Sequence, residues 1–174
     1  MPSTQLPGPP CALSRSAFIS TYGAIYEHSP WIAERLYDSE LTQRDNLADR
    51  LAHRMAAIVD AASDTEKRVL IRAHPDLVGK TAIAGKLTKA SREEQNSAAL
   101  DQCTTDEFAE FQQLNQDYKN KFGFPFIFAV AGFHRREILK AFRQRIGNEQ
   151  AAEFCTALEQ IHRIALLRLR SLEQ

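Results

Sequence analysis

An all-α fold is predicted by three features of this sequence. Apolar residues recur at three- and four-residue steps along most of the chain, which is the period of a helix, and strand-like alternation is almost absent. Three segments carry the Ser/Thr-x-x-Glu pattern of a helix start, and the seven glycines are scattered. A chain of 174 residues buries a core without disulfides or a structural metal, so we expect a single compact multi-helix domain.

Helix starts and apolar faces divide the first half of the chain into elements. A long helix is expected over residues 42–62, with one apolar face made of Leu47, Leu51, Met55, Ile58, Val59 and Ala62. Ser63 and Glu66 have the spacing of a capping box and predict a short helix that ends before Pro75. The same spacing at Ser91–Glu94 and Thr104–Glu107 predicts two more helix starts.

The second half is expected to contain three helices and one extended segment. The helix that starts near Thr104 has Phe108, Phe111, Leu114 and Tyr118 on one side. Residues 122–132 then lose the helical period, and Pro125 favours an extended backbone before it, so we expect a buried, extended Phe-Pro-Phe segment. Helix resumes over residues 135–146 and again from residue 149, where a long apolar face suggests a central or dimer-forming helix.

Composition argues against several classes of protein. The 22 Lys and Arg residues balance the 22 Asp and Glu residues, which disfavours a nucleic-acid partner. The most apolar stretch, residues 122–133, is too short to cross a bilayer, so we expect no membrane partner. Residues 1–12 are rich in proline and read as a flexible tail, which leaves residues 13–174 as one domain.

The cysteines and the chain ends predict a cytoplasmic location. Cys11, Cys103 and Cys155 are far apart and odd in number, which indicates neither a disulfide framework nor a zinc site. The N-terminal residues do not form an export signal, and the last residues do not form the Ser-Lys-Leu peroxisomal signal. A reducing cytoplasm fits these features best.

His74 is the first candidate for a functional residue. It lies between a predicted helix end and Pro75, and its imidazole titrates near neutral pH, which suits an acid–base group. The alternative is that His74 only caps the helix before it. No other histidine lies three to five residues away, so we expect no metal at this position.

Three further groups of residues are candidates for the same site. Ser91, Glu94 and Gln95 place hydroxyl, carboxylate and amide groups on one helical turn, although Glu94 could equally be only a cap. The segment 122–128 is either plain core or a stretch whose backbone groups bind a ligand. Arg168 falls near the apolar face of the last helix and is our choice over Arg163 for an inward-facing guanidinium.

Together these residues resemble one family. The matching positions are His74-Pro75-Asp76-Leu77, Gly79-Lys80, Leu87-Thr88, Ser91, Glu94-Gln95, Leu114-Asn115, Tyr118, Phe122 to Ile127, Ile164-Ala165 and Leu167-Arg168-Leu169. Their order and spacing resemble the 2-oxo-4-hydroxy-4-carboxy-5-ureidoimidazoline (OHCU) decarboxylases of urate breakdown. The resemblance covers nearly the whole chain and departs at Ala131, where many members of the family carry a cation.

The resemblance implies a cofactor-independent carboxy-lyase that converts OHCU to (S)-allantoin. It implies catalytic roles for His74 and Glu94, and substrate contacts from Pro75, Ser91, Gln95, Phe126, Ile127, Phe128 and Arg168. It also implies a small-molecule substrate, no metal or other cofactor, and a homodimer. Which of His74 and Glu94 delivers the stereospecific proton stays open.

Two other functions stay open on the residues alone. A non-catalytic helical module, with the segment 122–128 and the last helix as a protein-binding surface, explains the helical periodicity and the neutral charge equally well. A lyase acting on a related imidazoline is the nearer alternative. The catalytic hypothesis differs from the first of these because it requires His74, Glu94, Gln95 and Arg168 to converge.

Overall fold

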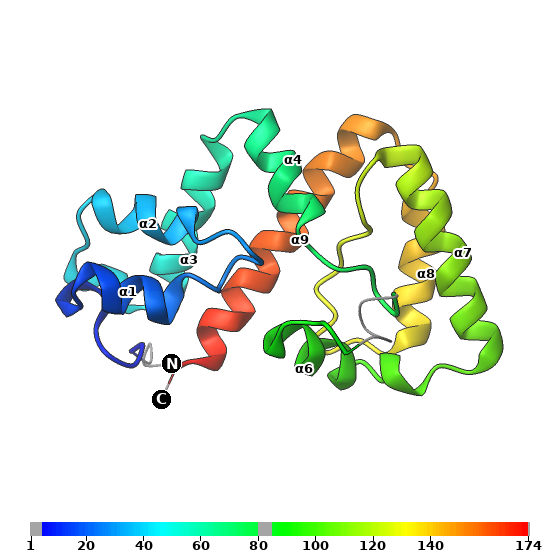
Figure 1. Cartoon of the computed structure of the whole chain (residues 1–174), viewed down its shortest axis with the longest axis horizontal. Helices are drawn as coiled ribbons and strands as arrows, with labels where there is room; N and C mark the ends of the chain where they lie inside the picture. Colours follow the sequence, from blue (N-terminus) through cyan, green and yellow to red (C-terminus); the bar gives the residue numbers. More distant parts are fainter. Residues whose placement is uncertain (1–4, 80–84, 174) are drawn as a thin grey trace. The chain divides into compact units, whose positions relative to one another are not determined.

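The computed structural model describes residues 5–79 and 85–173. Within these ranges the chain forms eight α-helices and three short 3₁₀-helices (Figure 1). The α-helices are α1 (Arg15–Tyr22), α2 (Trp31–Asp38), α3 (Ala48–Asp60), α4 (Asp64–Arg72), α6 (Lys89–Ser97), α7 (Thr105–Phe122), α8 (Arg135–Arg145) and α9 (Gln150–Ser171). The described residues contain no β-strand, only an isolated bridge between Gln5 and Leu47, so the all-α prediction is confirmed.

The chain groups into two compact units. The first unit comprises Met1–Ala73 with Ile161–Gln174, and the second comprises His74–Gln160. The sequence predicts one domain over residues 13–174, and nothing in it marks a linker at either boundary. The second boundary falls inside α9, so this helix contributes residues to both units.

Helices α1 and α2 belong to the first unit and are missing from the sequence-based expectation. Each has only eight residues, about two turns, which is too short for a periodic pattern to stand out. Helix α1 starts at a Ser14 cap, whose hydroxyl oxygen accepts the N–H of Ala17. Buried Phe18 and Leu36 show that tertiary packing stabilises these short helices.

Helix α3 starts later than the expected range of 42–62. The apolar face is as predicted, with Leu51, Met55 and Val59 fully buried. Residues Gln43–Asn46, however, form a 3₁₀-helix with its own capping box between Thr42 and Asp45. The expected helix included this turn, although residues 43–46 are all polar and the apolar face begins only at Leu47.

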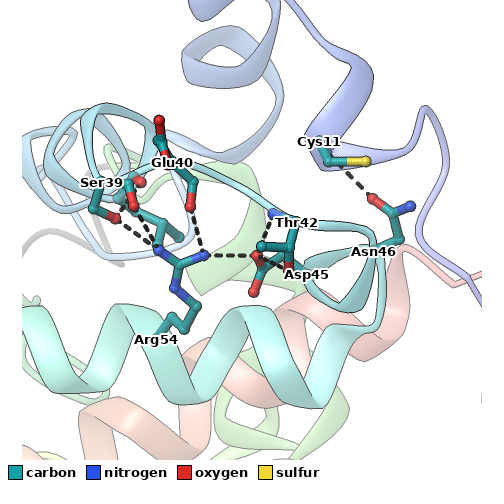
Figure 2. Close-up of polar contacts among 8 residues, drawn as sticks. Cys11, Ser39, Glu40, Thr42, Asp45, Asn46 and Arg54 are labelled. Atoms are coloured by element: carbon teal, nitrogen blue, oxygen red, sulfur yellow. Dashed lines mark hydrogen bonds and ion pairs between the residues drawn. The ribbon is translucent and has the colours of Figure 1, made fainter.

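Arg54 of α3 ties this 3₁₀ turn to the helix (Figure 2). Its guanidinium donates to Asp45 Oδ2 at 2.6 Å and to the backbone carbonyl oxygens of Ser39 and Glu40 at 3.2 and 3.0 Å. Burial by itself raises the pKa of Asp45, but hydrogen bonds from Thr42 and Arg54 outweigh burial and lower it. Arg54 is therefore a structural residue of the first unit.

The described part of the predicted tail is packed. Leu6 is buried and its N–H donates to the carbonyl oxygen of Asn46 at 2.9 Å. The side-chain oxygen of Asn46 accepts the N–H of Cys11 (Figure 2), and Pro10–Ala12 form a 3₁₀ turn. Residues 5–12 thus differ from the loose segment that their proline content suggests.

Two of the three predicted helix starts are confirmed. Ser63 and Glu66 form a reciprocal capping box at the start of α4. Thr104 and Glu107 do the same at the start of α7. In both cases the serine or threonine oxygen accepts the N–H of the glutamate, whose carboxylate accepts the N–H of the cap residue.

The second unit is built around α7, α8 and the extended segment between them. Helix α7 ends at Gly123 with φ 76°, and the chain then runs extended back to the start of α8, which packs beside α7 (Figure 1). The aromatic side chains packed here are Phe111, Tyr118, Phe122, Phe124, Phe126 and Phe142. The prediction of a buried, extended Phe-Pro-Phe segment is confirmed.

The apolar side of α9 is largely buried within the chain itself. Its buried residues are Ala157, Leu158, Ile161, Ile164, Ala165 and Leu169. The apolar pattern that suggested a dimer-forming helix is thus explained by packing inside one chain. No described helix has the length and apolarity that crossing a bilayer requires.

Candidate functional site

His74 is the first residue of the second unit and begins a short irregular segment after α4. Its side chain is buried, with 9% of the residue's surface exposed. We call residues 74–79 the His74 segment. A side-chain carbon at Gly79 would lie 2.6 Å from Cβ of Asp76, so only glycine fits there. Lys80, which the resemblance also includes, lies outside the described residues.

The candidate residues of α6 share one side of that helix. Ser91 and Gln95 are buried, with 4% and 6% exposed, and Glu94 is half-buried. Residues three and four apart are neighbours on a helix, so the hydroxyl, carboxylate and amide groups lie on one face. This face combines two buried polar side chains with a carboxylate, an unusual arrangement for plain core.

The predicted capping box between Ser91 and Glu94 is wrong. Helix α6 begins three residues earlier than expected, with Thr88 as its cap, and the Thr88 side-chain oxygen accepts the N–H of Ser91. Thr88 and Ser91 both fit the cap pattern, and a sequence rule does not decide between them. Ser91 and Glu94 are consequently inside the helix, where their side chains need not serve as caps.

Gln95 connects α6 with the His74 segment. Its side-chain oxygen accepts the backbone N–H of Val78 at 3.1 Å. The structure therefore brings the buried face of α6 together with the segment that follows His74. Gln95 and Val78 also line a cavity of about 590 Å³, with Arg92, Asn96 and Phe108 on its walls. His74 and Glu94 are not among the residues that line this cavity.

The segment Phe126 to Phe128 lies in the second unit and is only partly accounted for by core packing. Phe126 and Ile127 are buried, and Phe128 is half-buried. The Phe126 ring stacks on Phe142 at 3.8 Å between centroids, as a core residue would. The backbone N–H groups of residues 126–128 have no hydrogen-bond partner among the described residues, which leaves them available to a ligand.

The ion pair between Arg145 and Glu153 is joined to this segment by a hydrogen bond. Arg145 donates to the carbonyl oxygen of Ile127 at 2.7 Å and to Glu153 Oε1 at 2.5 Å. Glu153 is fully buried and also accepts the hydroxyl hydrogen of Tyr118. Burial, together with the bond to Glu153, raises the pKa of Tyr118 well above its ordinary value, so its hydroxyl stays protonated.

Arg168 belongs to the first unit and is buried there, as predicted. It has 8% of its surface exposed, and its Nη1 lies 2.9 Å from Glu27 Oε2 and 3.2 Å from the carbonyl oxygen of Ile25. Arg163 is exposed, so the choice between the two arginines is decided in favour of Arg168 as the inward-facing one. A buried guanidinium needs a carboxylate partner, and in this protein Glu27 supplies it.

Glu27 is a residue that sequence reasoning missed. It has 2% of its surface exposed and is 141 positions from Arg168. The available signal was a carboxylate in the irregular run Tyr26-Glu27-His28-Ser29-Pro30, outside any helical pattern. Gln112 and Lys119, which contact the His74 segment, were also missed because they look like ordinary surface residues of a helix.

Among the described residues there is no group of three or more His, Cys, Asp or Glu side chains that could hold a metal ion. Cys11, Cys103 and Cys155 are free thiols.

Comparison with known proteins assigns the chain to a family. The family model described as OHCU decarboxylase matches residues 11–170. The chain is 40% identical over 157 residues to a 2-oxo-4-hydroxy-4-carboxy-5-ureidoimidazoline decarboxylase of Haloferax volcanii, covering 90% of this chain and 89% of that protein. It is also 40% identical to the uric acid degradation bifunctional protein of Bacillus sp. (strain TB-90), of which it spans only 30%.

Solved structures show the same fold. A crystal structure of (S)-allantoin synthase aligns with a TM-score of 0.76 and 32% identity, over 95% of this chain and 52% of that one. A crystal structure of OHCU decarboxylase in the presence of (S)-allantoin aligns with a TM-score of 0.68 over 85% of this chain and 94% of that one, and at 22% identity it supports the fold alone. Because the family model spans most of the chain and relatives at 40% identity cover it almost end to end, this chain belongs to the OHCU decarboxylase family.

Proposed function

We propose that the protein decarboxylates OHCU to (S)-allantoin in urate degradation, without a cofactor. The observation that carries this proposal is the 40% identity over 90% of the chain to a decarboxylase of that name. The buried polar face of α6 and the buried His74 in the same unit support it, because a non-catalytic helical module has no need for either.

The substrate's own chemistry explains why a protein side chain suffices. OHCU carries a carboxylate and a hydroxyl on one ring carbon, next to a ring C=N carbon that bears the ureido group. When the C–C bond to the carboxylate breaks, CO2 leaves and the electron pair moves into the adjacent C=N system. The ring nitrogen of the former C=N takes up one proton and the carbon that bears the ureido group takes up another, while the hydroxyl loses its proton and becomes a carbonyl, so that one proton is consumed overall. The enzyme has to orient the carboxylate and protonate a single face.

In this proposal His74 and Glu94 are the acid–base pair. His74 takes the hydroxyl proton as the carbonyl forms, and Glu94 polarises the substrate or delivers the stereospecific proton. Each such proton transfer typically contributes about 10²–10⁴-fold in rate. The burial of His74 and the half-burial of Glu94 support these roles, since proton transfer is more selective where bulk water is excluded.

The remaining candidates would bind the substrate. Ser91 and Gln95 would hydrogen-bond the ureido or ring amide groups from the buried face of α6, and Pro75 of the His74 segment would also contact the substrate. Backbone N–H groups at Phe126, Ile127 and Phe128 would donate to substrate oxygens. Arg168 would hold an anionic or carbonyl edge of the substrate with its guanidinium group.

The proposal is tested by generating OHCU in place from urate with the two preceding enzymes and following circular dichroism. The expected result is an excess of (S)-allantoin that grows with the amount of this protein added. Formation of racemic allantoin at the spontaneous rate would instead favour the non-catalytic module. Faster turnover of a different imidazoline would favour the related lyase.

We also propose that the enzyme works in the cytoplasm as a homodimer. Free thiols at all three cysteines support a reducing compartment. Because α9 buries most of its apolar face within the chain, the dimer proposal rests on the family likeness rather than on that helix. Light scattering after gel filtration is expected to give twice the mass of the chain, and a single chain mass would contradict the dimer.

A further inference from the structure

One face of α7 holds three successive residues of the His74 segment. Lys119 Nζ lies 2.5 Å from Asp76 Oδ2, Asn115 Nδ2 donates to the Leu77 carbonyl at 2.9 Å, and Gln112 Nε2 donates to the Val78 carbonyl at 2.5 Å. The spacing of 112, 115 and 119 puts these side chains on the same side of the helix. We call Gln112, Asn115 and Lys119 the anchoring face of α7.

Asn115 is held in place at an energetic cost. It has 4% of its surface exposed, and its side-chain oxygen is buried without a hydrogen-bond partner among the described residues. A buried polar atom without a hydrogen-bond partner destabilises the fold. Leucine would remove that unpaired oxygen, but it would also leave the Leu77 carbonyl without its donor. Asn115 thus holds the Leu77 carbonyl at the cost of one unpaired oxygen.

Val78 adds a second, independent sign of constraint. Its φ is 53°, in the left-handed region that a β-branched residue rarely enters. Such a conformation is strained and persists only where the surroundings impose it. Here both backbone groups of Val78 are held, the N–H by Gln95 and the carbonyl by Gln112. Strained residues of this kind cluster at functional sites.

We propose that the anchoring face of α7 positions His74 for catalysis. Only Pro75 separates His74 from the anchored residues, and its ring fixes the backbone φ at that position. Holding Asp76, Leu77 and Val78 therefore limits where the imidazole can lie. Gln112, Asn115 and Lys119 are positioning residues, because they act on the proposed acid–base group and not on the substrate. This inference rests on the proposed function of His74.

The variants Gln112→Met, Asn115→Ala and Lys119→Met each remove one anchor. We expect kcat for OHCU to fall by about 10- to 100-fold while KM changes by less than about threefold, since small misplacements of a reacting group cost rates of this order. Lys119→Arg keeps the ion pair with Asp76 and should restore most of the rate. Gln113→Met, at an exposed position of the same helix, is the matched control and should match the wild type.

A double substitution separates positioning from a general loss of structure. In a His74→Asn background, Asn115→Ala should cause no further loss of the residual rate, because the residue that it positions is absent. An equal loss in both backgrounds, or full kcat in all three single variants, would overturn the proposal.

An NMR titration of the His74 ring tests positioning even if the protein proves inactive on OHCU. The signal is assigned from its loss in His74→Asn. We expect Asn115→Ala to shift or broaden the His74 resonances while Gln113→Met leaves them unchanged. Unchanged resonances in Asn115→Ala would contradict the positioning role, whereas absence of (S)-allantoin formation by the wild type contradicts only the proposed function.

Discussion

The side-chain oxygen of Gln95 accepts the backbone N–H of Val78, 3.1 Å away. A backbone N–H can only donate, so its partner has to be the oxygen of the Gln95 amide and not its nitrogen. The amide of Gln95 is therefore fixed in orientation. If Gln95 binds the substrate as proposed, it does so through its NH2 group, as a donor to a carbonyl or other oxygen acceptor.

Gln95→Glu tests this orientation. A carboxylate still accepts the N–H of Val78, but it offers a second oxygen where the substrate meets an NH2 donor. We expect normal folding and a KM for OHCU that is about tenfold higher, because a donor is replaced by an acceptor. Steady-state kinetics and thermal melting measure the two effects. A wild-type KM would show that the Gln95 NH2 group does not touch the substrate.

Arg168→Lys tests whether the buried arginine binds the substrate in addition to pairing with Glu27. A lysine keeps the positive charge for Glu27 but has no planar pair of donors for a second acceptor. We expect KM to rise by about 10- to 100-fold with little change in the melting temperature. Arg163→Lys, at an exposed position of the same helix, is the control. Equal KM values for both variants would mean that Arg168 does not bind the substrate.

The ionisation of Glu107 should make the stability of the fold depend on pH. The N–H of Thr104 and the guanidinium of Arg135 lower its pKa from 4.5 to about 2. Because the folded-state pKa lies below the unfolded value, ionised Glu107 stabilises the fold above about pH 4.5, and this contribution is lost as the pH falls towards 2.

The variant Glu107→Gln keeps an oxygen for the Thr104 N–H and loses the charge. It should unfold at lower urea than the wild type at pH 7, and the difference should shrink between pH 4.5 and pH 2. Glu159→Gln, at an exposed position of α9, is the control and should match the wild type throughout. A difference in stability between Glu107→Gln and wild type that is constant with pH would contradict the assignment.

Local sequence signals predicted the parts of the fold that depend on neighbours in the chain. The capping boxes at Ser63 and Thr104 worked because cap and partner are three residues apart. The capping box predicted at Ser91 was wrong because Thr88, three residues earlier, caps the helix instead. Helices α1 and α2 were missed because two turns carry too little periodicity, so packing decides their formation.

The sequence identified candidate site residues one by one, but it did not show which residues they contact. The sequence singled out His74, Gln95 and Arg168 as candidate site residues and expected Arg168 to face inward, and all three are buried in the structure. It did not identify their partners, since the Val78–Gln95 bond spans 17 positions and the Arg168–Glu27 pair spans 141. Contacts at such separations follow from the tertiary fold, and no local pattern encodes them.

The most direct test of the acid–base role of His74 is the initial rate of (S)-allantoin formation from freshly generated OHCU. This rate is measured by circular dichroism for the wild type and for His74→Asn at equal concentrations. Asparagine keeps a polar side chain of moderate size, so the variant should melt near the wild-type temperature. We predict rapid formation of one enantiomer by the wild type and a loss of about 10²-fold or more in His74→Asn. Near-normal stereospecific turnover by His74→Asn would contradict the account, because the acid–base chemistry would then lie elsewhere.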